Sequence, residues 1–168
     1  MLRITVPQQG LLPGSPNVLP LDIDAHVTAK KTFELSVDVF LKDCCPYQNT
    51  YFSRYIEWQG MCRERFLAEK LLAGATYDGI FLTKCAHQEF LDETYAFQRV
   101  RILLNTFQVK HCSTFLLFRF MVEDAYVGAG YQQIVCAGVD RQIQRFPEAI
   151  YRRTKEYEIS SNGLALAH

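Results

Sequence analysis

The spacing of hydrophobic and polar residues changes twice along the chain. From Phe33 to Leu41 the apolar side chains fall on odd positions with polar residues between them, which is the two-residue period of a half-buried strand. A turn, DCCPYQN, follows. From about Thr50 to Leu72 the apolar residues recur at steps of three and four and stop before Gly74, which predicts an amphipathic helix with a glycine at its end.

Four more strands are predicted after this helix. They are the segments rich in Phe, Val, Ile, Leu and Thr, namely Ile80 to Leu91, Tyr95 to Val109, Ser113 to Glu123 and Ala129 to Asp140. One strand, one long helix and a run of strands with short links favour an antiparallel sheet with the helix packed on one face. The fold class expected is therefore α+β, with about five strands, and a short terminal helix is expected near Glu148 to Lys155.

The length and composition indicate one folded domain. The chain has 168 residues, of which 49% are hydrophobic and 21% are charged, enough for one full core and not for two. Residues 1–30 are punctuated by Pro and Gly without periodicity, so we expect an irregular N-terminal arm there. The folded domain is expected at residues 31–158 and a flexible tail at residues 159–168.

The charge balance argues against two classes of partner. The 18 basic and 18 acidic side chains cancel, whereas proteins that bind phosphate backbones or anionic lipid usually carry a basic surplus. The first residues are interrupted by Gln, Gly and Pro, and no apolar stretch is long enough to span a bilayer. We therefore expect a cytoplasmic protein that binds neither nucleic acid nor membrane.

The six cysteines and four histidines do not form a metal motif. There is no Cys-x-x-Cys pair and no histidine at ligand spacing, so structural zinc is not expected. In a cytoplasmic protein, most of the six cysteines are expected to be buried free thiols that act as small hydrophobic residues.

The predicted helix combines aromatic and charged residues. Asn49 and Thr50 precede it and are residue types that cap helices. An apolar stripe of Tyr55, Trp58, Cys62 and Phe66 is fully explained as the face that packs on the core.

The charged residues of the helix fall into two groups. Those at 54 and 57, and at 65 and 69, are spaced for surface ion pairs. Arg63 has no acidic residue at i+4 and lies beside the apolar stripe. This placement leaves its role open.

Three short sequence motifs in this segment resemble those of a known family. They are Asn-x-Tyr-Phe at Asn49 to Phe52, Trp-Gln-Gly at Trp58 to Gly60 and Cys-Arg-Glu-x-Phe-Leu at Cys62 to Leu67. Together with the order of strands and helix they resemble the hotdog fold and its 4-hydroxybenzoyl-CoA thioesterase-like group. The closer resemblance is to the thioesterases of enediyne polyketide pathways, and it covers roughly residues 33 to 150.

The resemblance implies hydrolysis of an acyl thioester that is held on the phosphopantetheine arm of an acyl carrier protein domain of a polyketide synthase. It implies no cofactor of the enzyme's own and a homodimer or tetramer. The alternatives are a general acyl-CoA thioesterase and a non-catalytic hotdog protein that binds acyl thioesters. A helix N-terminus suits the oxyanion of thioester hydrolysis, and an acyl chain needs an apolar slot, which Tyr51 and Phe52 could line.

The resemblance also assigns candidate catalytic residues. Arg63 matches the arginine of the Cys-Arg-Glu motif. Tyr55 matches a tyrosine in the helix, and Asn49 matches the asparagine that opens the helix. The loop position where the broader group carries an aspartate, and the enediyne group an asparagine, is occupied here by Cys45.

Three interpretations of Cys45 stay open. The thiol could be a nucleophile activated by the helix dipole. It could be a spectator, with water attacking directly. The loop could also be shifted by a residue or two, so that Asp43 reaches the site.

Overall fold

The computed structural model describes residues 29–159. The arm predicted for residues 1–30 lies outside the described residues except for its last two, and the tail predicted for residues 159–168 lies outside them except for Ile159. Within the described part, no helix is long and apolar enough to cross a membrane.

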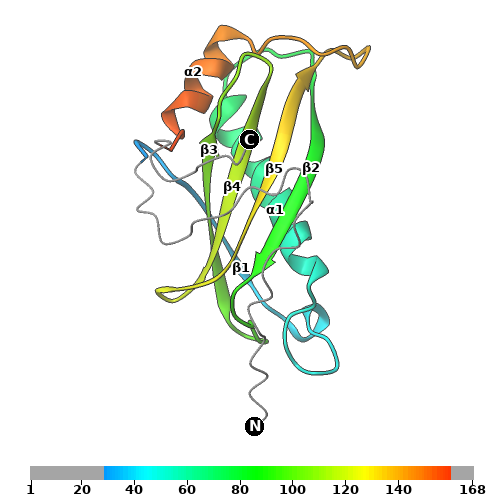
Figure 1. The fold of residues 1–168 in the computed structure, drawn as a ribbon, viewed down its shortest axis with the longest axis vertical. Coiled ribbons are helices and arrows are strands. Elements are labelled where there is room, and N and C mark those ends of the chain that lie inside the picture. The colour runs from blue at the N-terminus through cyan, green and yellow to red at the C-terminus, as the bar shows by residue number, and fades with distance from the viewer. Residues whose placement is uncertain (1–28, 160–168) are drawn as a thin grey trace, which may run out of the picture.

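The described elements form one antiparallel sheet and two helices (Figure 1). They are β1 (Phe33–Asp38), the 3-10 turn η1 (Leu41–Asp43), α1 (Ser53–Phe66), the π-helical turn η2 (Leu67–Leu71), β2 (Ile80–Phe90), β3 (Arg99–Phe107), β4 (Ser113–Val122), β5 (Ala125–Ala137) and α2 (Glu148–Glu156). The five strands lie in the order β1-β3-β4-β5-β2. The predicted α+β class and strand number are confirmed.

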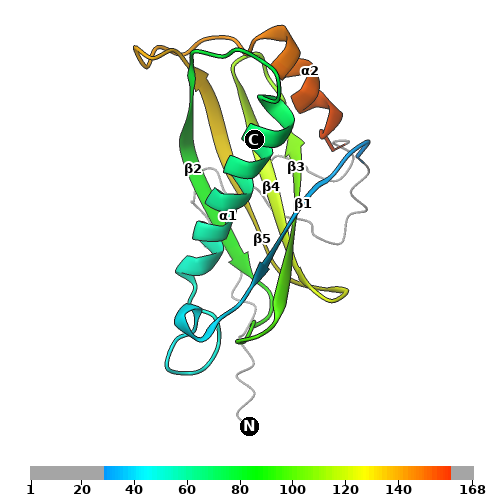
Figure 2. The ribbon, with the colours of Figure 1, turned by 180° about the vertical axis from the view of Figure 1, so that it is seen from behind.

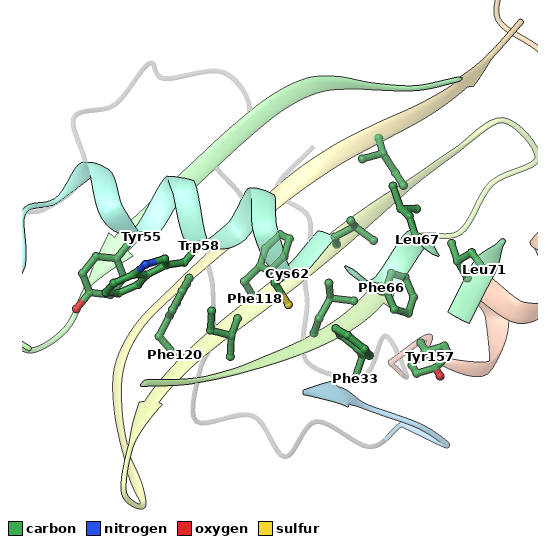
Figure 3. Packing of buried hydrophobic residues seen from close by; sticks show 14 of the residues in the cluster. Phe33, Tyr55, Trp58, Cys62, Phe66, Leu67, Leu71, Phe118, Phe120 and Tyr157 are labelled. Carbon is green, nitrogen blue, oxygen red and sulfur yellow. The ribbon is translucent and has the colours of Figure 1, made fainter. Parts of the chain in front are cut away.

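Helix α1 runs along one face of the sheet (Figure 2). Its apolar stripe packs on the sheet as predicted, because Tyr55, Trp58, Cys62 and Phe66 are all buried, and Figure 3 shows them against the aromatic residues of β4. Burial of each large side chain of this kind stabilises the fold by about 1.5–3 kcal/mol.

The start of α1 differs from the prediction. The helix begins at Ser53, and its N-cap residue is Phe52, which makes no side-chain capping bond. The expectation that Asn49 or Thr50 caps the helix is wrong, because both side chains bond instead to the link between β2 and β3. At the other end, η2 carries the helical turns to Leu71, and Gly74 follows with φ +66°.

The strand limits also differ in part. Residues 95–98 form a turn, in which Tyr95 N–H donates to the side chain of Gln98 and Phe97 has a φ of 71°, so β3 begins at Arg99. Strand β5 starts earlier than predicted, at Ala125, because its first residues pair with the end of β4. Leu41 faces solvent with 71% of its surface exposed, since the chain turns into η1 after β1.

The expectation that most cysteines are buried is wrong. Only Cys62 and Cys136 are buried among the six, whereas Cys85 is exposed and the other three are half-buried. Burial raises the pKa of the Cys62 thiol to about 12, as an apolar environment disfavours a thiolate. The remaining four lie in turns or on the edge strand β2, positions that a linear pattern does not separate from core positions.

Candidate functional site

Two segments far apart in the sequence meet beside the start of α1. Thr50 N–H donates to Thr94 O at 2.7 Å, and Asn49 pairs with Tyr95 as an isolated antiparallel bridge. The Thr50 and Thr94 hydroxyls are 2.6 Å apart, and the Tyr55 hydroxyl lies 3.0 Å from Thr94 Oγ1. These bonds fix the β2–β3 link against the loop that leads into the helix.

A continuous chain of polar side chains lies at this junction. Cys45 Sγ donates to Asn49 Oδ1 at 2.6 Å, and Asn49 Nδ2 donates to Glu93 Oε1 at 2.9 Å. Tyr95 OH donates to the other carboxylate oxygen, Glu93 Oε2, at 2.6 Å. We call Cys45, Asn49, Glu93 and Tyr95 the helix-start corner.

The orientation of the Asn49 amide follows from its neighbours. An ionised carboxylate only accepts hydrogen bonds, so Asn49 must turn its NH₂ group toward Glu93. Its carbonyl oxygen then faces Cys45, which must donate and therefore be a protonated thiol. The corner thus places the Cys45 thiol in a donor role toward Asn49.

The two tyrosines of this region are neutral donors. The hydrogen bond to Glu93, then burial and the nearby negative charge, raise the pKa of Tyr95. Burial is the main cause of the raised pKa of Tyr55. Both phenols therefore keep their protons at neutral pH.

The helix start leaves two backbone donors open. The N–H groups of Arg54 and Tyr55 bond to Tyr51 O and Phe52 O, whereas in the described part of the chain the N–H groups of Phe52 and Ser53 donate to no protein acceptor. Free N–H groups at the positive end of a helix can stabilise an oxyanion.

The structure brings together only part of the predicted site. Cys45 and Asn49 are in direct contact at the corner. The Tyr55 hydroxyl bonds to Thr94, which adjoins the corner. Only 2% of the Tyr55 surface is exposed, and its ring packs between Trp58, Phe90 and Phe120.

The two predicted slot residues lie on the surface. Tyr51 and Phe52 are 48% and 59% exposed, and their ring centroids are 4.6 Å apart. They form an apolar surface beside the corner.

Arg63 does not belong to the corner of its own chain. It lies ten residues beyond Ser53, which is about 15 Å along a helix. Its Nη1 donates to Thr83 Oγ1 at 2.5 Å and to Gln132 Oε1 at 3.2 Å, so it links α1 to β2 and β5.

The shifted-loop interpretation, with Asp43 at the site, finds no support in the contacts of Asp43. This residue is buried. Its Oδ2 accepts the N–H of Phe40 at 3.0 Å, and its Oδ1 lies 3.4 Å from Arg54 Nε. Both carboxylate oxygens are therefore engaged in holding η1 and the helix start together.

The sequence did not point to Glu93 or Tyr95. Glu93 follows β2 in the run Asp-Glu-Thr, which reads as an ordinary polar turn, and Tyr95 is expected from the sequence to begin the next strand. Their approach to Asn49 depends on the pairing of segments 44 residues apart, and a local pattern carries no such information.

Exposed apolar side chains gather at the end of the molecule that carries the corner. They come from η1, the loop before α1, the helix start, the end of β2 and the β2–β3 link, and they are Phe40, Leu41, Tyr47, Tyr51, Phe52, Ile56, Phe90, Leu91, Tyr95 and Phe97. A concentration of this kind marks a surface that binds a ligand or a partner.

A separate hollow of about 490 Å³ lies at the other end of β2. Its lining includes Tyr77, Asp78, Val139 and Arg145. Strand β2 has 11 residues, so the hollow is about 30 Å from the corner. Among the described residues no group of three or more His, Cys, Asp or Glu side chains is arranged to hold a metal ion.

Comparison with solved structures identifies the fold. The dynemicin thioesterase gives a TM-score of 0.69 at 22% identity, covering 77% of this chain and 99% of its own. A 1,4-dihydroxy-2-naphthoyl-CoA thioesterase from Synechocystis gives 0.63 at 14%, covering 74% and 96%. A predicted thioesterase from Bacillus stearothermophilus gives 0.69 at 10%, covering 76% and 97%. No protein-family model and no curated protein matches the sequence.

These likenesses establish that the chain has the hotdog fold, a long helix wrapped by an antiparallel sheet. The fold predicted from the helix motif is confirmed. Because fold alone does not define an activity, the function has to be argued from the helix-start corner.

Proposed function

We propose that the protein is a thioesterase that hydrolyses an acyl thioester at the helix-start corner. The observation that carries the proposal is the uncapped start of α1, where the N–H groups of Phe52 and Ser53 are free beside the polar chain of Asn49 and Glu93. Attack of water on a thioester produces an oxyanion, and removing one oxyanion donor typically costs 10²–10³ in kcat.

The apolar surface around the corner suits an acyl substrate. Tyr51 and Phe52 are exposed beside the free N–H groups, so a hydrocarbon chain could lie on them while its carbonyl oxygen faces the helix start. Each buried methylene group of the chain would add about 0.8 kcal/mol of binding.

We infer further that the acyl group is a polyketide chain carried by an acyl carrier protein. This finer proposal is supported by the three short motifs between Asn49 and Leu67 and by the likeness to the dynemicin thioesterase, which binds a polyene. A general acyl-CoA thioesterase is the second candidate, favoured by the likeness to the naphthoyl-CoA enzyme.

Steady-state assays test the activity and the carrier together. The same long acyl chain is presented on an acyl carrier protein, on CoA and on N-acetylcysteamine, and thiol release is followed. We expect multiple turnovers, with kcat/KM for the carrier protein at least tenfold above that for CoA. A higher kcat/KM for CoA would favour the second candidate, and no turnover with any carrier would favour a binding protein.

A further inference from the structure

The corner raises the question of which group accepts the proton of the attacking water. Cys45 donates a hydrogen bond to Asn49 and, among residues 29–159, contacts no base. Asp43 is buried with both oxygens engaged. A carboxylate is needed that lies at the corner and keeps an unoccupied lone pair.

Glu93 meets this requirement. Each of its oxygens receives one hydrogen bond, from Asn49 Nδ2 at 2.9 Å and from Tyr95 OH at 2.6 Å. Since a carboxylate has about four lone-pair sites, each oxygen can still accept a proton from water. The side chain is exposed, so water reaches it.

The charge of Glu93 is not neutralised by a cation. Among the described residues no Lys, Arg or His forms an ion pair with it, whereas Asp43 and Glu57 both pair with Arg54. The groups that do face it are the neutral Tyr95, Tyr55 and Asn49 and the neighbouring Asp92, whose Oδ1 accepts the Glu93 N–H at 2.8 Å. Glu93 is therefore an exposed carboxylate at the corner that, among the described residues, has no cationic partner.

The backbone around Glu93 is fixed against the helix start. Thr94, the next residue, is buried and bonds to Thr50 through both its carbonyl and its hydroxyl. Glu93 is therefore held against the loop that leads into α1 by the adjoining residue as well as by Asn49.

We propose that Glu93 is the general base of the reaction, and this inference rests on the proposed thioesterase function. Glu93 takes one proton from water while the water oxygen bonds to the thioester carbonyl carbon, and the carbonyl electrons move to an oxyanion at the helix start. Collapse breaks the carbon–sulfur bond, and the leaving thiolate takes that proton back from Glu93. The products are one carboxylic acid and one thiol.

In this mechanism Asn49 and Tyr95 are positioning residues. Each donates to one oxygen of Glu93 and so fixes the orientation of the carboxylate. Neither residue accepts the proton itself. This division explains why the loop position of Cys45 needs no carboxylate in this chain.

The test compares Glu93→Gln with Asp124→Asn, an exposed carboxylate in the β4–β5 turn. Glutamine keeps the shape and the acceptor for Tyr95 but cannot take a proton. We expect Glu93→Gln to lower kcat on the order of 100-fold, with KM and the melting temperature nearly unchanged, while Asp124→Asn has no effect. The fall of wild-type kcat/KM on acidification should disappear in Glu93→Gln.

Restoration of the base provides a second readout. Formate added to Glu93→Gly should recover part of the lost rate, in proportion to the formate concentration. If Glu93→Gln keeps the wild-type rate and the fall of kcat/KM on acidification, the proposal for Glu93 is wrong, while the thioesterase function stands. A wild-type enzyme without turnover would overturn the thioesterase function and this proposal with it.

Discussion

At the residue scale, Cys45 decides between two mechanisms. Its thiol donates to Asn49 Oδ1 and has no basic partner in the part of the chain that the structure describes, so we expect water, and not the thiol, to attack the substrate. Cys45→Ala should retain most of the turnover number.

The control for Cys45 is the neighbouring Cys44, also half-buried, as Cys44→Ala. Mass spectrometry of enzyme stopped during turnover is the direct readout. An acyl adduct on Cys45, or inactivation by iodoacetamide that substrate prevents, would contradict direct attack by water.

Arg63 separates an effect on rate from an effect on stability. Its bonds to Thr83 and Gln132 predict that Arg63→Ala costs about 1 kcal/mol of stability. The resemblance predicts in addition a turnover number at least tenfold lower, about 1.4 kcal/mol of barrier. Because Arg63 is remote from the corner of its own chain, such a rate loss would require a corner of a second copy.

Thr83→Val is the matched control for Arg63. It removes the same hydrogen bond but leaves the guanidinium group in place. Similar melting temperatures with a rate loss confined to Arg63→Ala would assign Arg63 to the reaction, whereas equal kinetics in both variants would assign it to the contact between α1 and the sheet.

At the element scale, the start of α1 supplies the oxyanion donors. Phe52 has a φ of −52°, which proline can adopt, so Phe52→Pro should remove one N–H while leaving the helix intact. We expect kcat to fall by about 10²-fold or more. Phe52→Ala keeps the N–H and removes the same ring, so it should mainly raise KM.

Circular dichroism and kinetics of the two Phe52 variants together give the answer. Equal kcat values for Phe52→Pro and Phe52→Ala, with helix content unchanged, would contradict a role for this backbone donor. A loss of helix in the proline variant would be seen directly in the spectrum, and the N–H of Ser53 would then be tested by ester-bond substitution at that position.

The elements themselves were largely predictable from the sequence, and the site only in part. The apolar period of β1 and the stripe from Tyr55 to Phe66 are local patterns, and the structure confirms both. The capping prediction for Asn49 and Thr50 is wrong because residues 93 and 94 compete for the same side chains. The resemblance names Asn49 and Cys45 as candidates, and the structure places them in contact, whereas no local pattern indicates Glu93, because only the pairing of distant segments brings it to Asn49.

At the scale of the whole molecule, the open edge of β2 predicts association. Residues 83–86, in the middle of this edge strand, are exposed in the single chain, and an uncovered strand edge pairs readily with another strand. We expect two copies to join through β2, so that light scattering gives about twice 19.4 kDa, or four times if dimers pair.

A charge placed on the edge tests this arrangement. Cys85 is the exposed thiol in the middle of β2, and Cys85→Lys should shift the population toward monomer because a lysine opposes edge pairing. Cys112→Lys, in the β3–β4 turn, is the control. A wild-type monomer at micromolar concentration with full activity would contradict association through β2.

The initial rate of thiol release from one long acyl thioester shows whether the helix-start corner hydrolyses thioesters. It is measured for the wild type, for Asn49→Ala at the helix-start corner and for Val139→Ala at the remote hollow. We expect multiple turnovers by the wild type and by Val139→Ala, with a rate at least tenfold lower for Asn49→Ala. No release by the wild type, or a loss in Val139→Ala with Asn49→Ala unaffected, would contradict this expectation.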